Sequence, residues 1–200
     1  VEGPDAEHGT HVAGVIAAVR GNGIGIEGIG GNDIKIMSLR AVPNGDERDK
    51  DVANAIRYAA DNGAKIMNWS FGKSHSPEKE LVWDAMKYAE SKGVLMVKAA
   101  GNDGENIDEV IHYPTNFDSK GNIVSNTLIT VGASTPDAEN LVASFSNYGI
   151  KSVDVFSPGT EILSTVPKNN YKEHQGTSMA SPIVAGVAAL VWSHYPNLTA

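Results

Sequence analysis

Three short motifs contain residue types that could carry out nucleophilic catalysis. They are HGTHVAG at residues 8–14, AAGN at 99–102 and GTSMASP at 176–182. A serine can attack a carbonyl, a histidine can remove its proton, and an Asn side-chain N–H can stabilise the negative charge that forms. Each motif alone also fits a structural role: a packed histidine, a turn asparagine or a serine that caps a helix.

The serine in the third motif has a favourable backbone environment for a nucleophile. Ser178 precedes a long apolar segment, so it should lie in the first turn of a helix. There its hydroxyl is near the positive helix end, and its own N–H has no partner within the helix. The chain has no cysteine, which excludes a thiol nucleophile, disulfides and Cys-based zinc sites.

A metal-dependent hydrolase is a weaker interpretation of the first motif. His8 and His11 are three residues apart, whereas a zinc peptidase helix needs a spacing of four with an intervening Glu. We therefore expect no catalytic metal. The GxGxxG pattern at residues 23–28 follows a predicted helix and leads into a predicted strand, the reverse of a dinucleotide-binding loop.

Together and in this order, the three motifs resemble those of the subtilisin-like serine peptidases, the subtilases, over essentially the whole chain. The resemblance implies a serine endopeptidase acting on proteins or peptides through a Ser/His/Asp triad. It assigns the nucleophile to Ser178, the general base to His8, and the oxyanion hole to the Asn102 side chain and the Ser178 N–H. It also implies that no cofactor is required and that the enzyme is bacterial and secreted or attached to the cell envelope.

The resemblance further implies two backbone walls that bind an extended substrate on either side of the side chain before the scissile bond. The walls consist of Ser70, Phe71 and Gly72, and of Ala99, Ala100 and Gly101. His112 falls at the base of the specificity pocket, where its bulk favours a small or medium substrate side chain. Lys98 stands just before the second wall, where the family usually has a small or apolar residue, so its ammonium group would be costly to bury.

The triad aspartate of the family is not found. Seven residues precede His8, and no Asp-Ser-Gly or Asp-Thr-Gly occurs. Asp5 is on the same loop as His8 and could hardly face the far side of the ring, and Asp33 and Asp154 have no better claim. We therefore expect an N-terminally truncated catalytic domain with weak or no activity. The gap in its sheet would be filled by the missing N-terminal segment or by a swapped or associated second chain.

A non-catalytic peptide-binding module is the alternative function. Such a module would keep the substrate groove and lose the triad. The survival of His8, Asn102 and Ser178 favours the peptidase, because only a contiguous terminus is missing.

Hydrophobic periodicity predicts strands alternating with helices in one domain over residues 1–200. Expected strands cover residues 34–42, 64–68, 94–99, 128–133 and 153–156; expected helices cover 12–19, 49–62, 76–92 and 177–195. We expect Leu81 on the buried stripe of the third helix, and Val187 and Val191 on that of the last. The pattern indicates a three-layer α/β/α fold with a mainly parallel sheet, lacking the N-terminal strand that carries the triad Asp.

Bulk composition limits the partners. The net charge of −8 provides no basic surface for nucleic acid, and no apolar run is long enough to span a membrane. In the family, the glycine-rich loop after the first helix often binds structural calcium, and Asn22 could donate an oxygen there. The carboxylates that would complete a calcium site are not evident.

Overall fold

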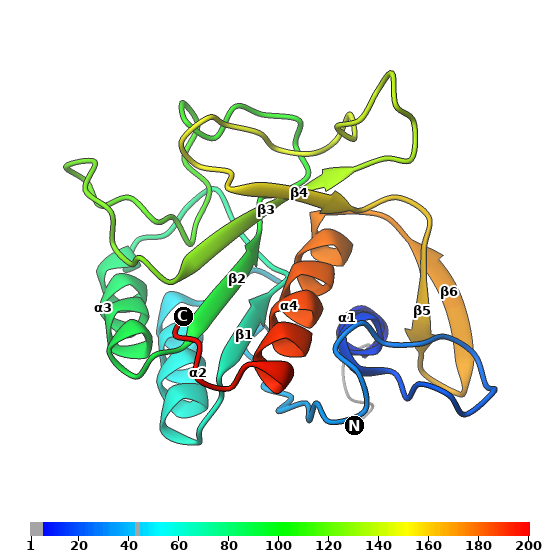
Figure 1. Ribbon diagram of the computed structural model, residues 1–200. Helices are drawn as coiled ribbons and strands as arrows, with labels where there is room; N and C mark the ends of the chain where they lie inside the picture. Colours follow the sequence, from blue (N-terminus) through cyan, green and yellow to red (C-terminus); the bar gives the residue numbers. More distant parts are fainter. Residues whose placement is uncertain (1–5, 43–44) are drawn as a thin grey trace.

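The computed structural model describes residues 6–42 and 45–200, so Asp5 lies outside the described residues. The elements, in chain order, are α1 (Glu7–Ala17), α2 (Asp49–Asp61), β1 (Ile66–Trp69), α3 (Lys79–Ser91), β2 (Leu95–Ala99), β3 (Leu128–Ser134), β4 (Val155–Pro158), β5 (Ile162–Val166), β6 (Asn170–His174) and α4 (Thr177–His194). Figure 1 shows their arrangement. No helix in the described ranges has the length and apolar character needed to cross a membrane.

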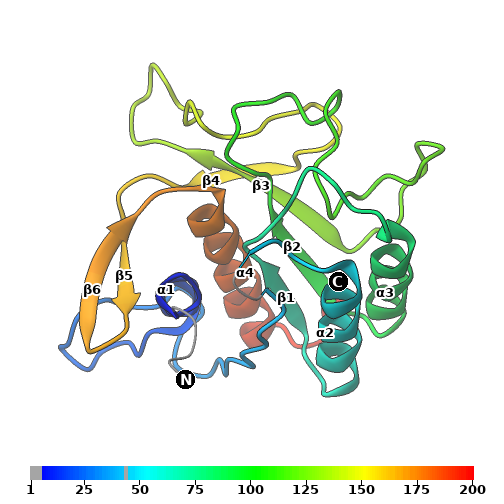
Figure 2. The same cartoon turned by 180° about the vertical axis from the view of Figure 1, so that it is seen from behind.

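A four-stranded parallel sheet forms the centre of the molecule, in the order β1-β2-β3-β4. Strands β5 and β6 form a separate antiparallel hairpin beside α1 (Figure 2). The carboxyl ends of β1 and β2 lead directly into residues 70–72 and 100–102. Parallel pairing places these two segments at the same edge of the sheet.

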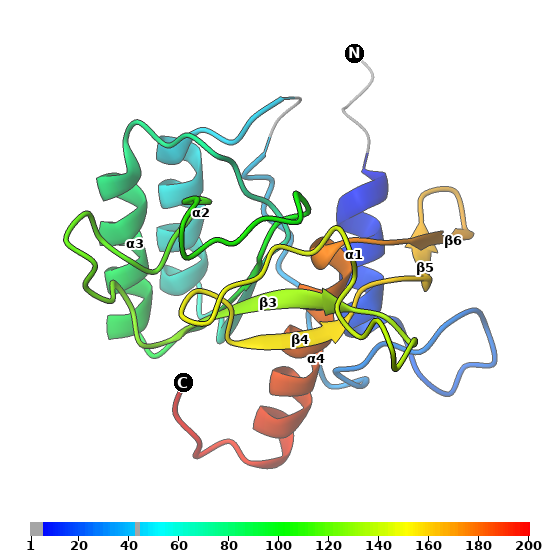
Figure 3. The ribbon, with the colours of Figure 1, turned by 90° about the horizontal axis from the view of Figure 1, so that it is seen from above.

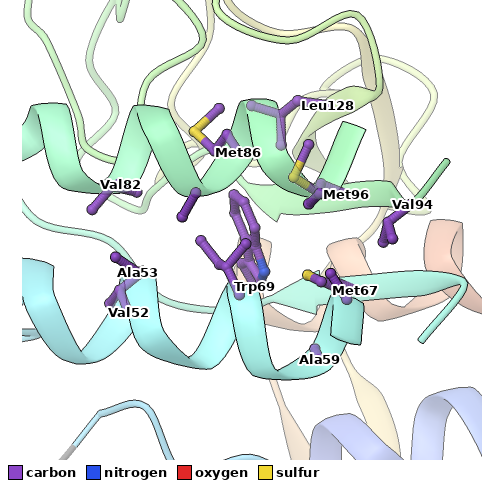
Figure 4. Packing of buried hydrophobic residues seen from close by; sticks show 14 of the residues in the cluster. Val52, Ala53, Ala59, Met67, Trp69, Val82, Met86, Val94, Met96 and Leu128 are labelled. Carbon is purple, nitrogen blue, oxygen red and sulfur yellow. The ribbon is translucent and has the colours of Figure 1, made fainter. Parts of the chain in front are cut away.

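Helices cover both faces of the sheet, with α2 and α3 on one side and α4 and α1 on the other (Figure 3). Residues of β2 alternate between the two sides: Met96 packs with the α2/α3 core, and Val97 packs with the α1/α4 core. Trp69 and Met86 fill the first of these cores, as Figure 4 shows. The expected three-layer α/β/α architecture is confirmed.

Helix α3 differs in two details from the prediction. It begins at Lys79 and not at Ser76-Pro77, because the buried Ser76 hydroxyl donates to Asp49 Oδ1 (2.7 Å) and does not cap the helix. The buried stripe also includes Trp83, whereas Leu81 is 43% exposed. The indole of Trp83 donates to the Thr115 carbonyl (3.1 Å), which holds the ring inward.

Apart from Met179 and Pro182 near its start, the buried face of α4 consists of small residues. Ala180, Ala185 and Ala189 are buried, while Val187 and Val191 are exposed, contrary to the expected apolar stripe. Small side chains allow the helix axis to approach the sheet and the neighbouring loop closely; a Cβ on Gly186 would lie 3.0 Å from Ile29 Cβ.

Two further expectations about strands are wrong. Residues 34–42 form no strand, and Ile36, Met37 and Leu39 are exposed, because no strand within the described ranges pairs with them. A strand needs a hydrogen-bonded neighbour to satisfy its backbone groups. The β5–β6 hairpin was not predicted, since its exposed, polar β6 lacks a clear apolar pattern.

Candidate active site

The side chain of Asn102 is fixed by the first residue of α4. Its Oδ1 accepts hydrogen bonds from the Thr177 backbone N–H (2.8 Å) and from the Thr177 hydroxyl (2.9 Å). The Thr177 Oγ1 also accepts a hydrogen bond from the Gly101 N–H (3.1 Å). The Thr177 hydroxyl is therefore bonded both to the backbone of Gly101 and to the side chain of Asn102. With its oxygen engaged, the amide of the exposed Asn102 keeps its Nδ2 available as a donor.

Two donors converge beside Gly176. A Cβ built on this residue would lie 3.4 Å from Asn102 Nδ2 and 3.7 Å from the Ser178 backbone N. Gly176 has φ of 142°, a conformation that L side chains rarely adopt, so the backbone angle at this position favours glycine. The Ser178 N–H is one of the unpaired donors at the start of a helix. The arrangement is suited to binding an oxyanion.

The half-buried Ser178 is linked to the segment after β1. The Ser70 hydroxyl donates to the Ser178 carbonyl (2.8 Å), and the Ser178 hydroxyl donates to the Ser70 carbonyl (3.3 Å). The Ser178 carbonyl is available because Pro182, four residues later in α4, has no N–H to donate to it.

A short polar chain continues this link into the sheet. Ser181 donates to Asn68 Oδ1 (2.7 Å), and Asn68 Nδ2 donates to the Ser70 hydroxyl (2.9 Å). The first turn of α4 is therefore tied to the carboxyl end of β1 through Ser70, which the sequence analysis named, and through the side chains of Asn68 and Ser181, to which it gave no role. In the sequence, the only local sign of this polar chain is Asn68, a polar residue directly before Trp69 and Ser70.

His8 lies in the first turn of α1, with its side chain exposed. Two effects lower the pKa of His8 below its ordinary value. The larger is desolvation of the ring by the surrounding protein, and the smaller is electrostatic repulsion from the nearby His174. The ring therefore stays neutral, and able to accept a proton, at pH values around neutrality. Among the described residues, no hydrogen bond fixes the His8 ring, and the Ser178 hydroxyl donates to Ser70.

His11 is a structural residue, which removes the metal interpretation of the first motif. Its side chain is fully buried, and Nε2 lies 3.0 Å from each of the carbonyl oxygens of Ile162 and Lys172. Its ring packs edge-on against His174, with centroids 4.6 Å apart. The His11 ring therefore anchors α1 to the β5–β6 hairpin.

The wall at residues 99–101 is held from behind by Asn147, which the sequence analysis missed. Fully buried Asn147 donates from Nδ2 to the Ala100 carbonyl (3.1 Å) and from its backbone N–H to the Gly101 carbonyl (2.9 Å). Ala99 is the last residue of β2, and the Ala100 N–H donates to Val131 (2.9 Å).

The opposite wall, Ser70 to Gly72, contacts the segment before α2. The Gly72 N–H donates to Glu47 Oε1 (3.1 Å), and the Lys73 ammonium donates to the Glu47 carbonyl (2.6 Å). Lys73 also pairs with the buried Asp49 carboxylate (2.7 Å). Phe71 is half-buried against the α2/α3 core. These contacts fix the wall to the amino end of α2.

Desolvation would raise the pKa of Asp49. The ammonium group of Lys73, the Ser76 hydroxyl and the Glu78 N–H outweigh that effect, so the pKa of this carboxyl is lowered. The charged pair lines a mostly apolar pocket beside Phe71 and Tyr113.

His112 lies beside the second wall, at the end of a loop that returns to Gly101. Its Nδ1 would be 3.4 Å from a Cβ on Gly101. Its Nε2 is 3.0 Å from Glu105 Oε2, and its Nδ1 is 3.7 Å from Asp103 Oδ2. Glu105 thus forms a hydrogen bond with the ring and Asp103 lies nearby; the sequence analysis singled out neither acid.

Lys98 is buried in the middle of β2, with 3% exposure, and no ion pair to it occurs within the described part of the chain. Burial lowers the pKa of its ammonium group to about 8.

The acids weighed as orienting groups occupy other positions. Asp154 Oδ2 accepts from the Thr130 N–H (2.7 Å), between β4 and β3. Asp33 is exposed on the segment after α1.

In the glycine-rich loop, Asn22 Oδ1 accepts from the Ile24 N–H (2.9 Å), and Glu27 pairs with Arg20 (3.7 Å). No cluster of metal-ligating side chains forms in that loop.

The comparisons with known proteins decide the family. The profile of the Subtilase family matches residues 2–200. The chain belongs to the subtilase family. It is 43% identical over 192 residues to the thermophilic serine proteinase of Bacillus sp. (strain AK1), covering 95% of this chain and 43% of that relative.

Two further relatives support the assignment. The cell wall-associated protease of Bacillus subtilis (strain 168) is 40% identical, with 97% of this chain and 20% of the relative covered. A cold-adapted subtilisin-like serine proteinase of known structure has a TM-score of 0.77 and 32% identity, with 96% and 63% covered. This subtilase chain spans less than two thirds of the length of each of these relatives.

Proposed function

We propose that the chain provides the nucleophile, general base and oxyanion donors of a serine endopeptidase that hydrolyses peptide bonds. Ser178 attacks the carbonyl carbon, His8 takes the hydroxyl proton and later gives it to the leaving amine, and Asn102 Nδ2 and the Ser178 N–H stabilise the oxyanion. The observation that supports this proposal is the convergence of the two N–H donors on one point beside Gly176.

The substrate would be an extended protein or peptide segment between residues 70–72 and 99–101. Binding there requires two internal contacts to open. The Ser178 hydroxyl must leave the Ser70 carbonyl, and Glu47 must release the Gly72 N–H, before either backbone group can pair with a substrate strand.

Within the described residues, the site lacks the orienting acid of the triad. No carboxylate in the described ranges forms a hydrogen bond with His8. Loss of that acid lowers turnover roughly 10⁴-fold in serine peptidases, because the imidazole is no longer held in the required tautomer. We expect the 200-residue chain to be weak or inactive as a peptidase.

A further segment or a second chain would complete the site. Strand β1 is an edge of the four-stranded sheet, and the apolar side chains of Ile36, Met37 and Leu39 are exposed. Both features suit the addition of a strand from a further segment, or from a swapped or associated second copy. Light scattering after size-exclusion chromatography tests this: a monodisperse monomer that unfolds cooperatively contradicts it.

Covalent labelling tests the chemistry without requiring full turnover. A biotinylated fluorophosphonate should modify Ser178, as mapped by peptide mass spectrometry, and Ser178→Ala should abolish the signal. His8→Ala should slow labelling while leaving the fold intact by circular dichroism. Labelling at other serines with Ser178 untouched would contradict the proposal.

A non-catalytic peptide-binding module is the second candidate. It is favoured by one observation, namely that the Ser178 hydroxyl bonds to the Ser70 carbonyl and no hydrogen bond joins it to His8. Under this alternative, extended peptides bind in the cleft, and Ser178 resists the fluorophosphonate even at millimolar concentration.

We propose a secreted or cell-envelope location in a bacterium, which the relative named as a cell wall-associated protease supports. The proposed hydrolysis uses side chains and the Ser178 backbone N–H of this chain and requires no cofactor. The loop at residues 20–28 offers the Asn22 oxygen toward structural calcium, but the carboxylate of Glu27 is directed to Arg20.

A further inference from the structure

Helix α1, which carries His8, is docked closely on the β5–β6 hairpin (Figure 2). The fully buried Ser164 hydroxyl of β5 donates to the His11 carbonyl (2.7 Å). A Cβ on Gly14 would lie 2.5 Å from Ser164 Oγ, so the helix and the strand are in direct contact. After β6 the chain enters the first turn of α4, where Ser178 lies. The hairpin therefore connects the helix of the proposed general base with the proposed nucleophile.

The buried ring of His11 completes this docking and has one possible neutral tautomer. Its Nε2 lies 3.0 Å from the carbonyl oxygens of Ile162 and of Lys172, which can only accept hydrogen bonds. Nε2 therefore carries the proton, and Nδ1 carries the lone pair. The Nδ1 atom is buried and has no hydrogen-bond partner within the described residues. A second proton, on Nδ1, would thus place a positive charge in a fully buried ring with no acceptor for the new N–H.

The ionisable groups beside the His11 ring would not offset that charge. His174 packs edge-on against the ring, with centroids 4.6 Å apart, and His8 lies one turn earlier in α1; both rings gain positive charge in acid. The Glu7 carboxylate is engaged with other cations, since its Oε1 lies 2.8 Å from Lys172 Nζ and 3.0 Å from His174 Nε2.

The other elements packed on α1 supply no ionisable group to His11. Strand β5 contains none, and the only one in α4 is His194, whose ring bonds to the Leu190 carbonyl of its own helix (3.0 Å). In β6, Glu173 alternates with His174 and so faces away from α1. Burial, and more weakly the charges of the two neighbouring histidines, lower the pKa of His11 below its ordinary value, against a smaller opposing effect of its two hydrogen bonds.

We propose that His11 is a positioning residue that holds the general-base helix on the β5–β6 hairpin near neutral pH and releases it in acid. In the released state the ring is hydrated and takes up the second proton. Release would separate His8 from Ser178, the two groups that must meet for proton transfer. This inference rests on the proposed function, because it assigns an acid-sensitive control to the same site.

The direction of the pH dependence follows from the lowered pKa of His11. Above the ordinary value of 6.5 the ring is neutral whether α1 is docked or released, so pH does not shift the equilibrium. Below that value the released state binds one more proton than the docked state, until the pKa of the docked state is reached. Release should therefore increase up to about tenfold for each pH unit in this window.

Amide hydrogen exchange of the whole 200-residue chain, read by mass spectrometry, measures the release. After correction for intrinsic exchange rates, protection of α1 and of the hairpin should fall about tenfold or more between pH 6.5 and about 5.5. Protection of α2 and α3, in the core on the other face of the sheet, should not change. Protection of α1 that is independent of pH overturns the inference.

A conservative variant isolates the contribution of His11. In His11→Gln, the side-chain amide can donate to the same two carbonyls but cannot take up a proton. This variant should lose about tenfold of the fall in protection, and any remainder reports the other histidine of α1, His8. His75→Gln, at an exposed histidine before α3, is the matched control and should keep the full fall. An unchanged fall in His11→Gln overturns the inference.

A second measurement does not depend on the folding of that variant. Near neutral pH, imidazole ¹⁵N chemical shifts of the unmodified chain should show a protonated Nε2 and an unprotonated Nδ1 for His11. A doubly protonated His11 ring in acid, in a chain whose α1 amides stay protected, would mean that the docked structure accommodates the charge. That result also overturns the inference.

Fluorophosphonate labelling of Ser178 distinguishes this failure from failure of the proposed function. If Ser178 is labelled near neutral pH while protection of α1 does not depend on pH, the peptidase chemistry holds and the inferred release is wrong. If Ser178 is labelled at no pH, but α1 loses protection in acid and His11→Gln reduces that loss, the release holds and the proposed chemistry fails.

Discussion

Ser70 and Ser178 exchange hydrogen bonds across the cleft, each hydroxyl donating to the backbone carbonyl of the other residue, at 2.8 and 3.3 Å. The first of these bonds exists because Pro182 cannot donate to the Ser178 carbonyl, which leaves that acceptor open in the first turn of α4. The proline of the third motif thus attaches the helix that carries the nucleophile to the wall that binds substrate.

This relationship predicts a coupling between Ser70 and Pro182. Ser70→Ala should lower the free energy of unfolding by about 1–2 kcal/mol, because the Ser178 carbonyl and Asn68 Nδ2 lose their partners. In a Pro182→Ala background the restored N–H can serve the same carbonyl, so the cost of Ser70→Ala should be smaller. A double-mutant cycle from urea unfolding measures the difference, and strictly additive effects would refute the link.

The Asn102–Thr177 link predicts an effect on oxyanion stabilisation. Asn102→Leu should slow fluorophosphonate labelling of Ser178 about 10²-fold or more, a magnitude taken from loss of such a donor in a subtilisin. Thr177→Val removes one of the two donors that orient the amide and should cause a smaller loss. Thr177→Ser keeps the hydroxyl and serves as the control; equal losses for valine and serine would contradict this role of the hydroxyl.

The pH dependence of labelling should report His8. Desolvation and His174 lower the pKa of His8, so the ring remains neutral until the pH falls below the ordinary value of 6.5. Labelling should therefore decline only below pH 6.5. His174→Gln removes a positive neighbour and should move this decline to higher pH.

His194→Gln, at the exposed end of α4, is the matched control and should leave the profile unchanged. If the profile of the His174→Gln variant overlies that of the unmodified chain, the electrostatic coupling is absent.

Because Lys98 is buried, we predict that the free energy of unfolding changes with pH in the alkaline range. Its folded-state pKa of about 8 is below the unfolded value of 10.5, so the unfolded chain binds more protons between these values. The cost of the charged form, about 3 kcal/mol below pH 8, should disappear as pH rises toward 10.5. Lys98→Met should accordingly stabilise the protein at pH 7 and give little benefit near pH 10.5.

The control for this prediction is Lys87→Met, an exposed residue of α3, which should change stability little at any pH. Thermal unfolding of both variants from pH 6 to about 10 gives the comparison. A stabilisation by Lys98→Met that is the same at all pH values would mean that packing, and not charge, is responsible.

Local sequence signals predicted most of the fold. Acids at the start of α2 and apolar runs for β2 and β3 identified these elements, because the signals depend only on neighbouring residues. The signals failed where a distant partner decides the outcome. Residues 34–42 have a strand-like composition but no strand beside them, and Val187 faces solvent because α4 packs through its alanines.

The sequence by itself determined the family, through three motifs that contain His8, Asn102 and Ser178. Only the tertiary structure decided which way the Asn102 amide faces, what holds the 99–101 wall, and that Asp103 and Glu105 meet at His112. Those contacts join residues far apart in the chain, such as Asn102 and Thr177. Their geometry depends on how the helices pack on the sheet, which no local pattern of residues specifies.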